Sequence, residues 1–291
     1  MTAERDDRRN LSVEHLADRA KFVRLETLRL TRIAGAGHYS STFSCAELFA
    51  ALYYGHLRLD PQNPSWPDRD RFVLSKGHAA IGLYPVLADL GFYPPSKLDD
   101  FTRLGSAFGD HPDMKKIPGV DFSSGSLGHG LSVALGMALA GRVTGRGYRT
   151  YCMLGDGELN EGQIWEAAMA AGHYKLQGLV AIVDRNQLSI DGPTEKVMSV
   201  EPIDERFRAF GWDVHRIDGH DLSAIMETLG ALKPAGHGKP QMIVADTIKG
   251  RGVKYMELSL DWHVGNLVGQ DYDDAFAEIE AGLKPRERED A

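Results

Sequence analysis

Cysteines, long apolar runs and an excess of basic residues are largely missing from this sequence. There are only 2 cysteines, Cys45 and Cys152, which rule out a disulfide framework and supply no zinc-binding spacing, so we expect both in the core. No run of about 18 apolar residues could span a bilayer. The formal net charge is -8. Because nucleic-acid surfaces need clustered Lys and Arg, the sequence indicates neither a membrane protein nor a nucleic-acid-binding one.

Secretory and multidomain features are also missing. The first residues, MTAERDDRRNLSV, are rich in charge and lack the apolar segment of a signal peptide, which favours a cytoplasmic location. Charged runs of mixed sign at residues 5–9 and 286–289 are typical of short solvated tails. Between them no repeat, low-complexity tract or interdomain linker stands out. We therefore predict that residues 1–291 form a single domain with polar tails at both ends.

The first half of the chain predicts mainly helices and one long loop. Apolar spacing and breaker residues indicate helices at about residues 11–33, 81–90 and 131–142. Ser44 and Glu47 have the spacing of a capping box, which predicts a further helix from there to about Tyr54. Residues 105–130 are rich in glycine with weak periodicity, and loops of this length are usually functional or disordered.

The second half alternates strands with helices. Short apolar runs predict strands at residues 150–154, 179–184, 212–217 and 242–247, and an earlier run lies at 72–74. Helical patterns at 164–174 and 222–232 lie between them. Such alternation is typical of an α/β fold with a mostly parallel sheet and helices on both faces.

Two polar residues stand directly after two of these strands. Asp156 lies between two glycines in GDGELNEG, and Asn186 follows one helix and one strand later. A right-handed βαβ crossover brings the carboxyl ends of such strands together, at the edge where α/β sheets bind ligands. A carboxylate, an amide oxygen and a loop carbonyl suit Mg²⁺ carrying a diphosphate. Asp156 could alternatively do no more than cap the following helix.

Several segments resemble the transketolase family. The Gly155–Asp156–Gly157 and Asn186 pattern is similar to the family's thiamine diphosphate motif, and NEGQIWEA after it is similar to the transketolase form. Further matching segments, in the same order, are LSKGH, GDHP, SGSLGHGLS, IDGHD and TIKGRGVKYME. The resemblance covers most of the chain and implies the diphosphate-binding domain of a thiamine diphosphate fold.

The resemblance also implies a cofactor site. Asp156, Asn186 and the carbonyl of Leu188 would hold Mg²⁺, for which Ca²⁺ or Mn²⁺ could substitute. The residues implied to contact thiamine diphosphate are His78, Gly125, Ser126, Leu127, Gly155, Asp156, Gly157, Glu158, Asn186 and His263.

Four histidines are the implied catalytic group. His38, His78, His111 and His263 match family histidines near the cofactor or substrate, whereas a loop histidine taken alone is more often a solvated one. Glu161 matches an acidic residue at the family's dimer contact, although helix first turns favour glutamate for dipole reasons alone. Gly219 and His220 are assigned no chemistry.

A second chain is implied by length. Family members are about twice as long and carry pyrimidine-binding and carboxyl-terminal domains. The resemblance therefore implies the amino-terminal subunit of a split transketolase, an α₂β₂ heterotetramer that transfers a two-carbon ketol unit between sugar phosphates.

Three alternatives stay open at this point. One is a specialised ketol or acyloin transferase of an unusual sugar or secondary pathway, which would share every motif. A second is another two-subunit thiamine enzyme, such as a 2-oxo acid dehydrogenase E1 α-like subunit or a deoxyxylulose phosphate synthase relative. The third is a noncatalytic interaction protein, which would be expected to lose Asp156 or Asn186.

Overall fold

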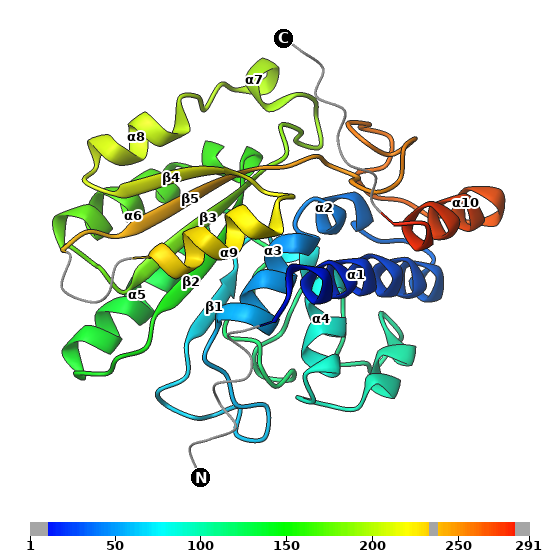
Figure 1. The fold of residues 1–291 in the computed structure, drawn as a ribbon, viewed down its shortest axis with the longest axis horizontal. Coiled ribbons are helices and arrows are strands. Elements are labelled where there is room, and N and C mark those ends of the chain that lie inside the picture. The colour runs from blue at the N-terminus through cyan, green and yellow to red at the C-terminus, as the bar shows by residue number, and fades with distance from the viewer. Residues whose placement is uncertain (1–10, 233–237, 283–291) are drawn as a thin grey trace.

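The chain folds around one parallel β-sheet, as seen in a computed structural model that describes residues 11–232 and 238–282 (Figure 1). The strand order is β1-β2-β3-β5-β4, and all four neighbouring pairs are parallel. The strands are β1 (Arg71–Leu74), β2 (Thr150–Gly155), β3 (Leu179–Arg185), β4 (Asp213–Asp218) and β5 (Gln241–Asp246). The predicted α/β class is confirmed, whereas the predicted polar tails lie outside the described residues.

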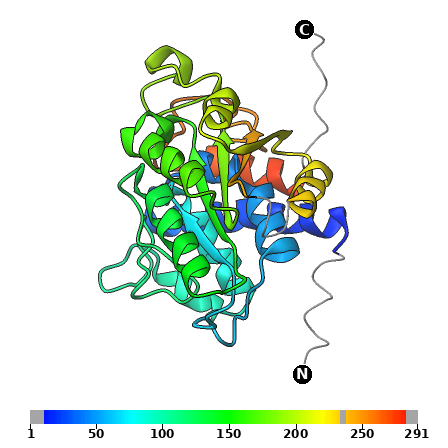
Figure 2. The ribbon, with the colours of Figure 1, turned by 90° about the vertical axis from the view of Figure 1, so that its left-hand side faces the viewer.

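Helices cover both faces of the sheet, because successive strand residues point to opposite sides. One face packs against α5 (His129–Val143), α6 (Gly162–His173) and α8 (Ile203–Ala209). The other packs against α1 (Val13–Ala34), α3 (Ala46–Ala50), the π-helix Ala51–His56, α4 (Ala80–Asp89) and α9 (Leu222–Ala231). In Figure 2 the green helices α5 and α6 lie on one side of the strands, with blue α1 and yellow α9 on the other.

Residues within single strands show the two cores directly. Along β3, Val180 and Ile182 belong to the core beneath α1 and α4, whereas Ala181 and Val183 belong to the core beneath α5 and α6. A strand buried on both faces needs the continuous apolar run that the sequence has here. Cys45 and Cys152 are unpaired and buried, one in each core, as predicted.

The predicted capping box at Ser44 and Glu47 is wrong. Helix α3 begins after Cys45, and no side chain caps it. The Ser44 hydroxyl oxygen instead lies 2.6 Å from the Asp184 carboxylate and 2.9 Å from the Ser41 carbonyl, which are the two acceptors within reach of its one O–H group. Glu47 forms a buried ion pair with Arg24 of α1 at 2.6 Å. A buried carboxylate gains more from this pairing than a cap would provide, so tertiary contacts override the local motif.

Several short helices and one longer one were not predicted. These are α2 (Tyr39–Phe43), α7 (Thr194–Val197), α8 (Ile203–Ala209) and α10 (Gly269–Glu280), together with 3₁₀ turns at Gly77–Ala79, Pro95–Asp100 and Gly157–Asn160.

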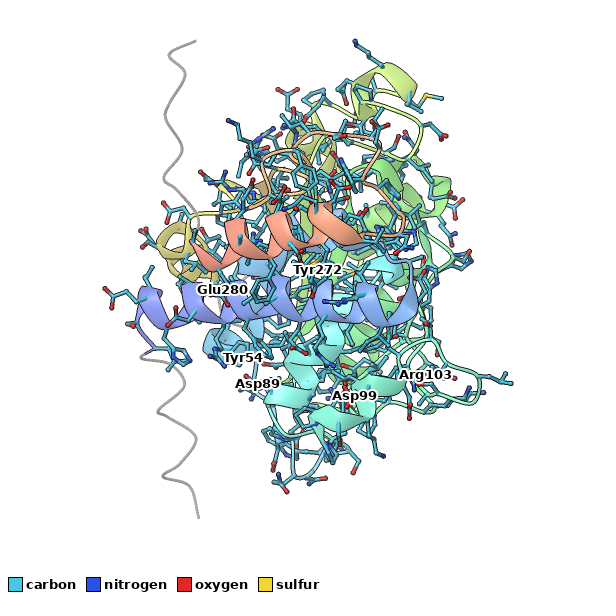
Figure 3. All side chains as sticks on the ribbon, turned by 90° about the vertical axis from the view of Figure 1, so that its right-hand side faces the viewer. Tyr54, Asp89, Asp99, Arg103, Tyr272 and Glu280 are labelled. Atoms are coloured by element: carbon cyan, nitrogen blue, oxygen red, sulfur yellow. The ribbon has the colours of Figure 1, made fainter. Side chains whose placement is uncertain are left out.

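Helix α10 shows why it escaped prediction. It is acidic and buries only Ala275 and Ile279, so it has few apolar positions from which a helix could be predicted. Figure 3 shows it lying alongside α1, with Tyr272 and Glu280 on the shared side. Arg32 stacks on the Tyr272 ring, and Lys21 pairs with Glu280 at 2.6 Å. The partner helix therefore stabilises it.

The long glycine-rich loop is present as predicted. No helix or strand is described between Phe101 and Gly128, so this segment crosses the carboxyl edge of the sheet as irregular chain. Among the described residues, no helix is both long and apolar enough to cross a membrane.

Candidate active site

A cavity of about 590 Å³ opens at the carboxyl edge of the sheet. Its walls come from the loops after β1, β2, β3 and β5, from the start of α2 and from the glycine-rich loop. In open parallel sheets the strand tips and helix starts present polar groups at this edge. Most of the site residues predicted from the sequence line this cavity.

The tips of β2 and β3 are joined directly by hydrogen bonds. These strands are parallel neighbours with Gly155 opposite Asp184. Asp156 accepts from the Gly157 N–H at 2.9 Å and from the Gln187 N–H at 2.6 Å. The predicted juxtaposition of Asp156 and Asn186 is therefore present. Asp156 also precedes the Gly157–Asn160 turn as its cap, so the cap alternative and the site location coexist.

The amide of Asn186 has a defined orientation. Its nitrogen donates to Asp184 at 3.1 Å, and its oxygen accepts from the Leu188 N–H at 3.2 Å. Since a carboxylate accepts and an N–H donates, only this orientation satisfies both partners. The amide oxygen is thereby kept on the side of the Leu188 loop.

The donor set fits a hard divalent cation. Asp156, Asn186 and Leu188 all line the cavity and offer carboxylate, amide and carbonyl oxygens. Burial and the neighbouring Asp184 raise the pKa of Asp156 to about 6, so this carboxylate lacks charge compensation that a cation would supply. Within residues 11–232 and 238–282 no group of three or more His, Cys, Asp or Glu could hold a metal, so a cation here depends on amide and carbonyl oxygens.

Two buried lysines lie beneath this edge, and the sequence pattern assigned neither a role. Lys76, 1% exposed, forms an ion pair with Asp184, which raises the lysine pKa against the opposing effect of burial. Lys249, also 1% exposed, donates to the Leu188 carbonyl at 3.1 Å and lies 2.5 Å from His263 Nδ1.

Lys249 has no carboxylate within ion-pair distance in the described part of the chain. Burial, followed by the nearby Lys76 charge, lowers its pKa to about 8, so it still carries its proton at pH 7. A buried cation lining a cavity without a carboxylate partner is complementary to an anionic ligand.

Glycines give the cavity its close backbone walls. Gly125 has φ +144°, and a Cβ there would lie 2.9 Å from the His111 ring, so both conformation and space require glycine. Gly155, Gly157 and Leu127 also line the cavity.

Three predicted residues are placed differently from the rest. Ser126 and Glu161 are exposed and do not line the cavity. Glu158 reaches it, but its buried carboxylate is already bonded to Ser75, to the Gly128 N–H at 2.8 Å and to the Gly155 N–H at 3.0 Å. Glu158 therefore joins loops together and has little capacity left for a ligand.

The four predicted histidines gather at the cavity. Ring centres of His38 and His78 are 5.3 Å apart, His38 and His263 5.6 Å, and His38 and His111 6.3 Å. All four line the cavity although they come from distant parts of the sequence.

Two of these rings are held neutral. Burial, then the positive charge of Lys76, lowers the pKa of His78 well below its usual value. Burial, then Lys249, lowers the pKa of His263 to about 3. Neutral imidazoles at pH 7 can donate one hydrogen bond and accept another without introducing a further charge beside the lysines.

His220, to which the sequence assigned no chemistry, connects the segments under the site. Its Nε2 accepts from the Ile248 N–H at 2.9 Å, and its Nδ1 lies 2.9 Å from the Glu47 carboxylate. Ile248 directly precedes Lys249, so His220 ties the buried ion pair of Glu47 and Arg24 to the segment that carries this lysine.

The lysines could have been noticed in the sequence. Lys76 follows β1 and Lys249 follows β5, each directly after an apolar run at the edge that carries Asp156. A lysine in that position favours an anion site. Their burial depends on the loops packed over them, which the sequence pattern does not reveal.

The fold and the site together define a parallel α/β protein with a candidate anion and cation site at the carboxyl edge of its sheet. Residues 16–288 match the family model for the transketolase thiamine diphosphate-binding domain. The chain belongs to this family.

Relatives of similar length carry subunit names. The chain is 43% identical to the 6-deoxy-6-sulfo-D-fructose transketolase subunit SqwG of Clostridium sp. (strain MSTE9), covering 91% of this chain and 96% of that protein. It is 40% identical to a protein of Phocaeicola vulgatus named as one subunit of an apulose-4-phosphate transketolase, covering 96% of this chain and 99% of that protein.

Solved transketolases have the same fold over part of their length. The Campylobacter jejuni transketolase superimposes with a TM-score of 0.87 and 32% identity over 93% of this chain, but over only 43% of its own chain. This chain therefore spans less than half of a full-length transketolase.

Proposed function

We propose that this chain is the amino-terminal subunit of a two-chain transketolase that depends on thiamine diphosphate and Mg²⁺. The observation that carries the proposal is that Asp156 and Asn186 meet at neighbouring strand tips. The buried cation Lys249 lines the same cavity and has no carboxylate partner among the described residues. The match to the thiamine diphosphate-binding domain supports the cofactor.

The chain's own residues have distinct roles in this proposal. Asp156, Asn186 and the Leu188 carbonyl hold the cation, and Lys249 with the backbone of Gly155 and Gly157 faces the diphosphate. A carbonyl oxygen has two lone pairs, so Leu188 can serve Lys249 and a cation together. Gly125 and Leu127 form the wall beside the cofactor rings.

Thiamine diphosphate, when bound, supplies the carbanion chemistry that breaks and forms the C–C bond. The histidines around the cavity position the sugar hydroxyls and move protons. His78 and His263 remain neutral at physiological pH, which suits them to hydrogen bonding in both directions.

A second chain completes the site in this proposal. The relatives of matching length are named as subunits, whereas the full-length transketolases have roughly as much chain again beyond the matched part. We infer a companion that carries the pyrimidine-binding and carboxyl-terminal domains, a cytoplasmic α₂β₂ assembly, and phosphorylated or similarly acidic sugars as substrates. The present chain would then act as one domain of the whole.

The relatives also favour a specialised substrate. SqwG is named for a sulfonated fructose and the Phocaeicola protein for apulose 4-phosphate. We therefore keep a ketol transferase of an unusual sugar as the second candidate; it has the same cofactor site and differs only in its sugars.

Titration calorimetry of the full chain with thiamine diphosphate tests the proposal. Binding is expected with Mg²⁺ and is expected to weaken strongly when the metal is chelated. The D156N variant should bind more than about 100-fold more weakly, beyond the 10- to 100-fold typical of outer-shell changes. Asp191, which lines the same cavity and makes no predicted metal contact, provides the matched control D191N. Equal Mg²⁺-dependent affinity in the D156N variant and wild type would contradict the proposed site.

A further inference from the structure

We propose that Asp110 is a positioning residue that fixes the tautomer and the orientation of His38. The inference rests on the proposed function, since it takes His38 as a group that meets the substrate. His38 Nδ1 lies 3.2 Å from both carboxylate oxygens of Asp110. His111 Nδ1 lies 3.4 Å from the same carboxylate, so one acidic side chain faces two of the cavity histidines.

The contact determines which nitrogen of His38 carries the proton. Burial alone would raise the pKa of Asp110, but the hydrogen bond from His38 lowers it, so the carboxylate is ionised at pH 7. An ionised carboxylate only accepts hydrogen bonds, and His38 Nδ1 must therefore be the donor. The neutral ring then has a free lone pair on Nε2.

That lone pair is available to a ligand. His38 Nε2 makes no hydrogen bond within the described residues, and the His38 side chain is 19% exposed and lines the cavity. The neutral histidine side chain, when free in water, favours the opposite tautomer, with its proton on Nε2. Asp110 thus converts His38 from a ring that would donate toward the cavity into one that accepts a proton there.

The charges around His38 are few and well defined. The rings of His78, His111 and His263 surround it, and Lys249 and Lys76 lie behind them. Among the described residues, Asp110 is the only carboxylate within ion-pair distance of any of these four rings. Within residues 11–232 and 238–282, Asp110 is therefore the one acidic group placed to set the tautomer of His38.

A purely structural explanation is that Asp110 tethers the glycine-rich loop to the start of α2. The loop has other tethers nearby, because the Tyr84 hydroxyl donates to the Gly109 carbonyl at 2.9 Å and Gly125 packs against the His111 ring. Loss of the carboxylate should therefore leave the loop in place and change only the two rings that face it, His38 and His111.

Nitrogen NMR of the full chain with ¹⁵N-labelled histidine tests the proposal. Spectra are recorded near pH 8.5, about two units above the ordinary histidine pKa, and the His38 signals are assigned by their loss in the H38Q variant. Wild type should show His38 with its proton mainly on Nδ1. D110N and D110A should reverse this preference, because a neutral amide can donate to Nδ1 and alanine offers no acceptor. D113N, which removes an equal charge three residues on, should leave His38 unchanged.

Each outcome decides the question. A wild-type His38 protonated mainly on Nε2, or an unchanged ratio in the D110N variant, overturns the proposal. D110N has nearly the shape of aspartate, so it gives an answer even if the alanine variant fails to fold. Calorimetry with inorganic pyrophosphate and Mg²⁺ on the same samples tests the cofactor site separately. If the protein binds pyrophosphate but the D110N variant shows no tautomer change, only the role of Asp110 is contradicted. If the tautomer changes but pyrophosphate does not bind, only the proposed function is contradicted.

Discussion

The burial and charge of Lys249 indicate an anion site more clearly than its residue type does. The chain contains 33 lysines and arginines, and the position of Lys249 after a strand favours an anion site, but the sequence does not show that this lysine is buried. In the structure its ammonium group is buried, lines the cavity, and meets a carbonyl and a histidine in place of a carboxylate. An anion in the cavity would supply the missing negative charge.

Replacing Lys249 by methionine should weaken phosphate binding and stabilise the chain. A hydrogen bond to a charged group contributes about 1.5–3 kcal/mol, so affinity for pyrophosphate with Mg²⁺ should fall by roughly 10- to 150-fold. The melting temperature should rise, because a buried cation without a carboxylate partner is removed. Calorimetry and thermal melts measure the two effects.

Lys254 is the matched control for this change. It lies in the same loop with an exposed side chain, so K254M should alter neither affinity nor melting temperature. An unchanged pyrophosphate affinity in K249M would show that Lys249 does not face the anion.

At the scale of single residues, the sequence predicted which side chains lie close together where spacing carried the information. Asp156 and Asn186 could be paired because one βαβ unit separates them, and the histidines because they lie in matching segments. Lys76, Asp184 and Asp110 were missed because their roles depend on which side chains the loops bring together. Ser126 points out of the cavity because its loop turns there, which spacing does not reveal.

Buried polar contacts join the elements under the site. Arg24 of α1 binds both oxygens of Glu47 in α3 and also the backbone carbonyls of Phe43 and Arg251. His220 adds the loop between β4 and α9 to the same carboxylate. These contacts fix the helices against the segment that carries Lys249.

Replacing Glu47 by glutamine should cost about 3–5 kcal/mol of unfolding free energy, because it leaves the buried Arg24 without its countercharge. Burial alone would raise the Glu47 pKa, but Arg24 and His220 lower it to about 2. Since the folded pKa lies below the unfolded value, the carboxylate stabilises the fold above about pH 4.5, and this contribution is lost as pH falls toward 2.

Urea denaturation between pH 7 and the acid limit measures this dependence. Wild type should lose stability over that window, and the E47Q variant should lose less over the same range. Glu26 is the control, because it pairs with Arg29 at the surface of α1, and the E26Q variant should cost no more than about 1 kcal/mol. Equal costs for the two variants would contradict the importance of the buried pair.

Replacing His220 by phenylalanine should affect both stability and the site. The Ile248 N–H loses its acceptor and Glu47 loses a donor, which costs about 1–3 kcal/mol. Pyrophosphate affinity should fall as well, because Ile248 precedes Lys249. H220Q retains a donor and an acceptor and should recover part of both losses in denaturation and calorimetry. A loss of stability with unchanged affinity would limit His220 to a structural role.

Among the elements, those with many apolar positions were predicted, whereas several short helices and the acidic α10 were not. The strands and helices α5, α6 and α9 follow clear apolar patterns, because each buries a continuous face. Helices α2 and α10 depend on neighbours already in place, and the Ser44 and Glu47 capping box failed because those side chains had stronger partners elsewhere.

The molecule is built around one parallel sheet, and the candidate site lies open at the carboxyl edge of that sheet. The chain spans 43% of the Campylobacter transketolase, so the rest of that protein's length has no counterpart here. An open cavity lined by the buried Lys249 ammonium group and by neutral imidazole groups is consistent with a site that another chain covers.

The purified chain alone should therefore show no ketol transfer, even with Mg²⁺ and thiamine diphosphate present. Addition of the companion, isolated from the native host by its association with this chain, should restore transfer between sugar phosphates. A coupled assay for the released aldehyde measures both states, with the D156N variant plus companion as the inactive control. Full turnover by the isolated chain would show that no second polypeptide is needed.

The sequence by itself determined the α/β class, the positions of the main strands along the chain and the pairing of Asp156 with Asn186, because repeating apolar patterns and one crossover length are sufficient for these. Only the tertiary structure decided which polar groups share the cavity. Burial of Lys249, the ion pair of Lys76 with Asp184 and the Asp110 contact with His38 each depend on segments distant in sequence, and their energies depend on exclusion of water that no local pattern specifies.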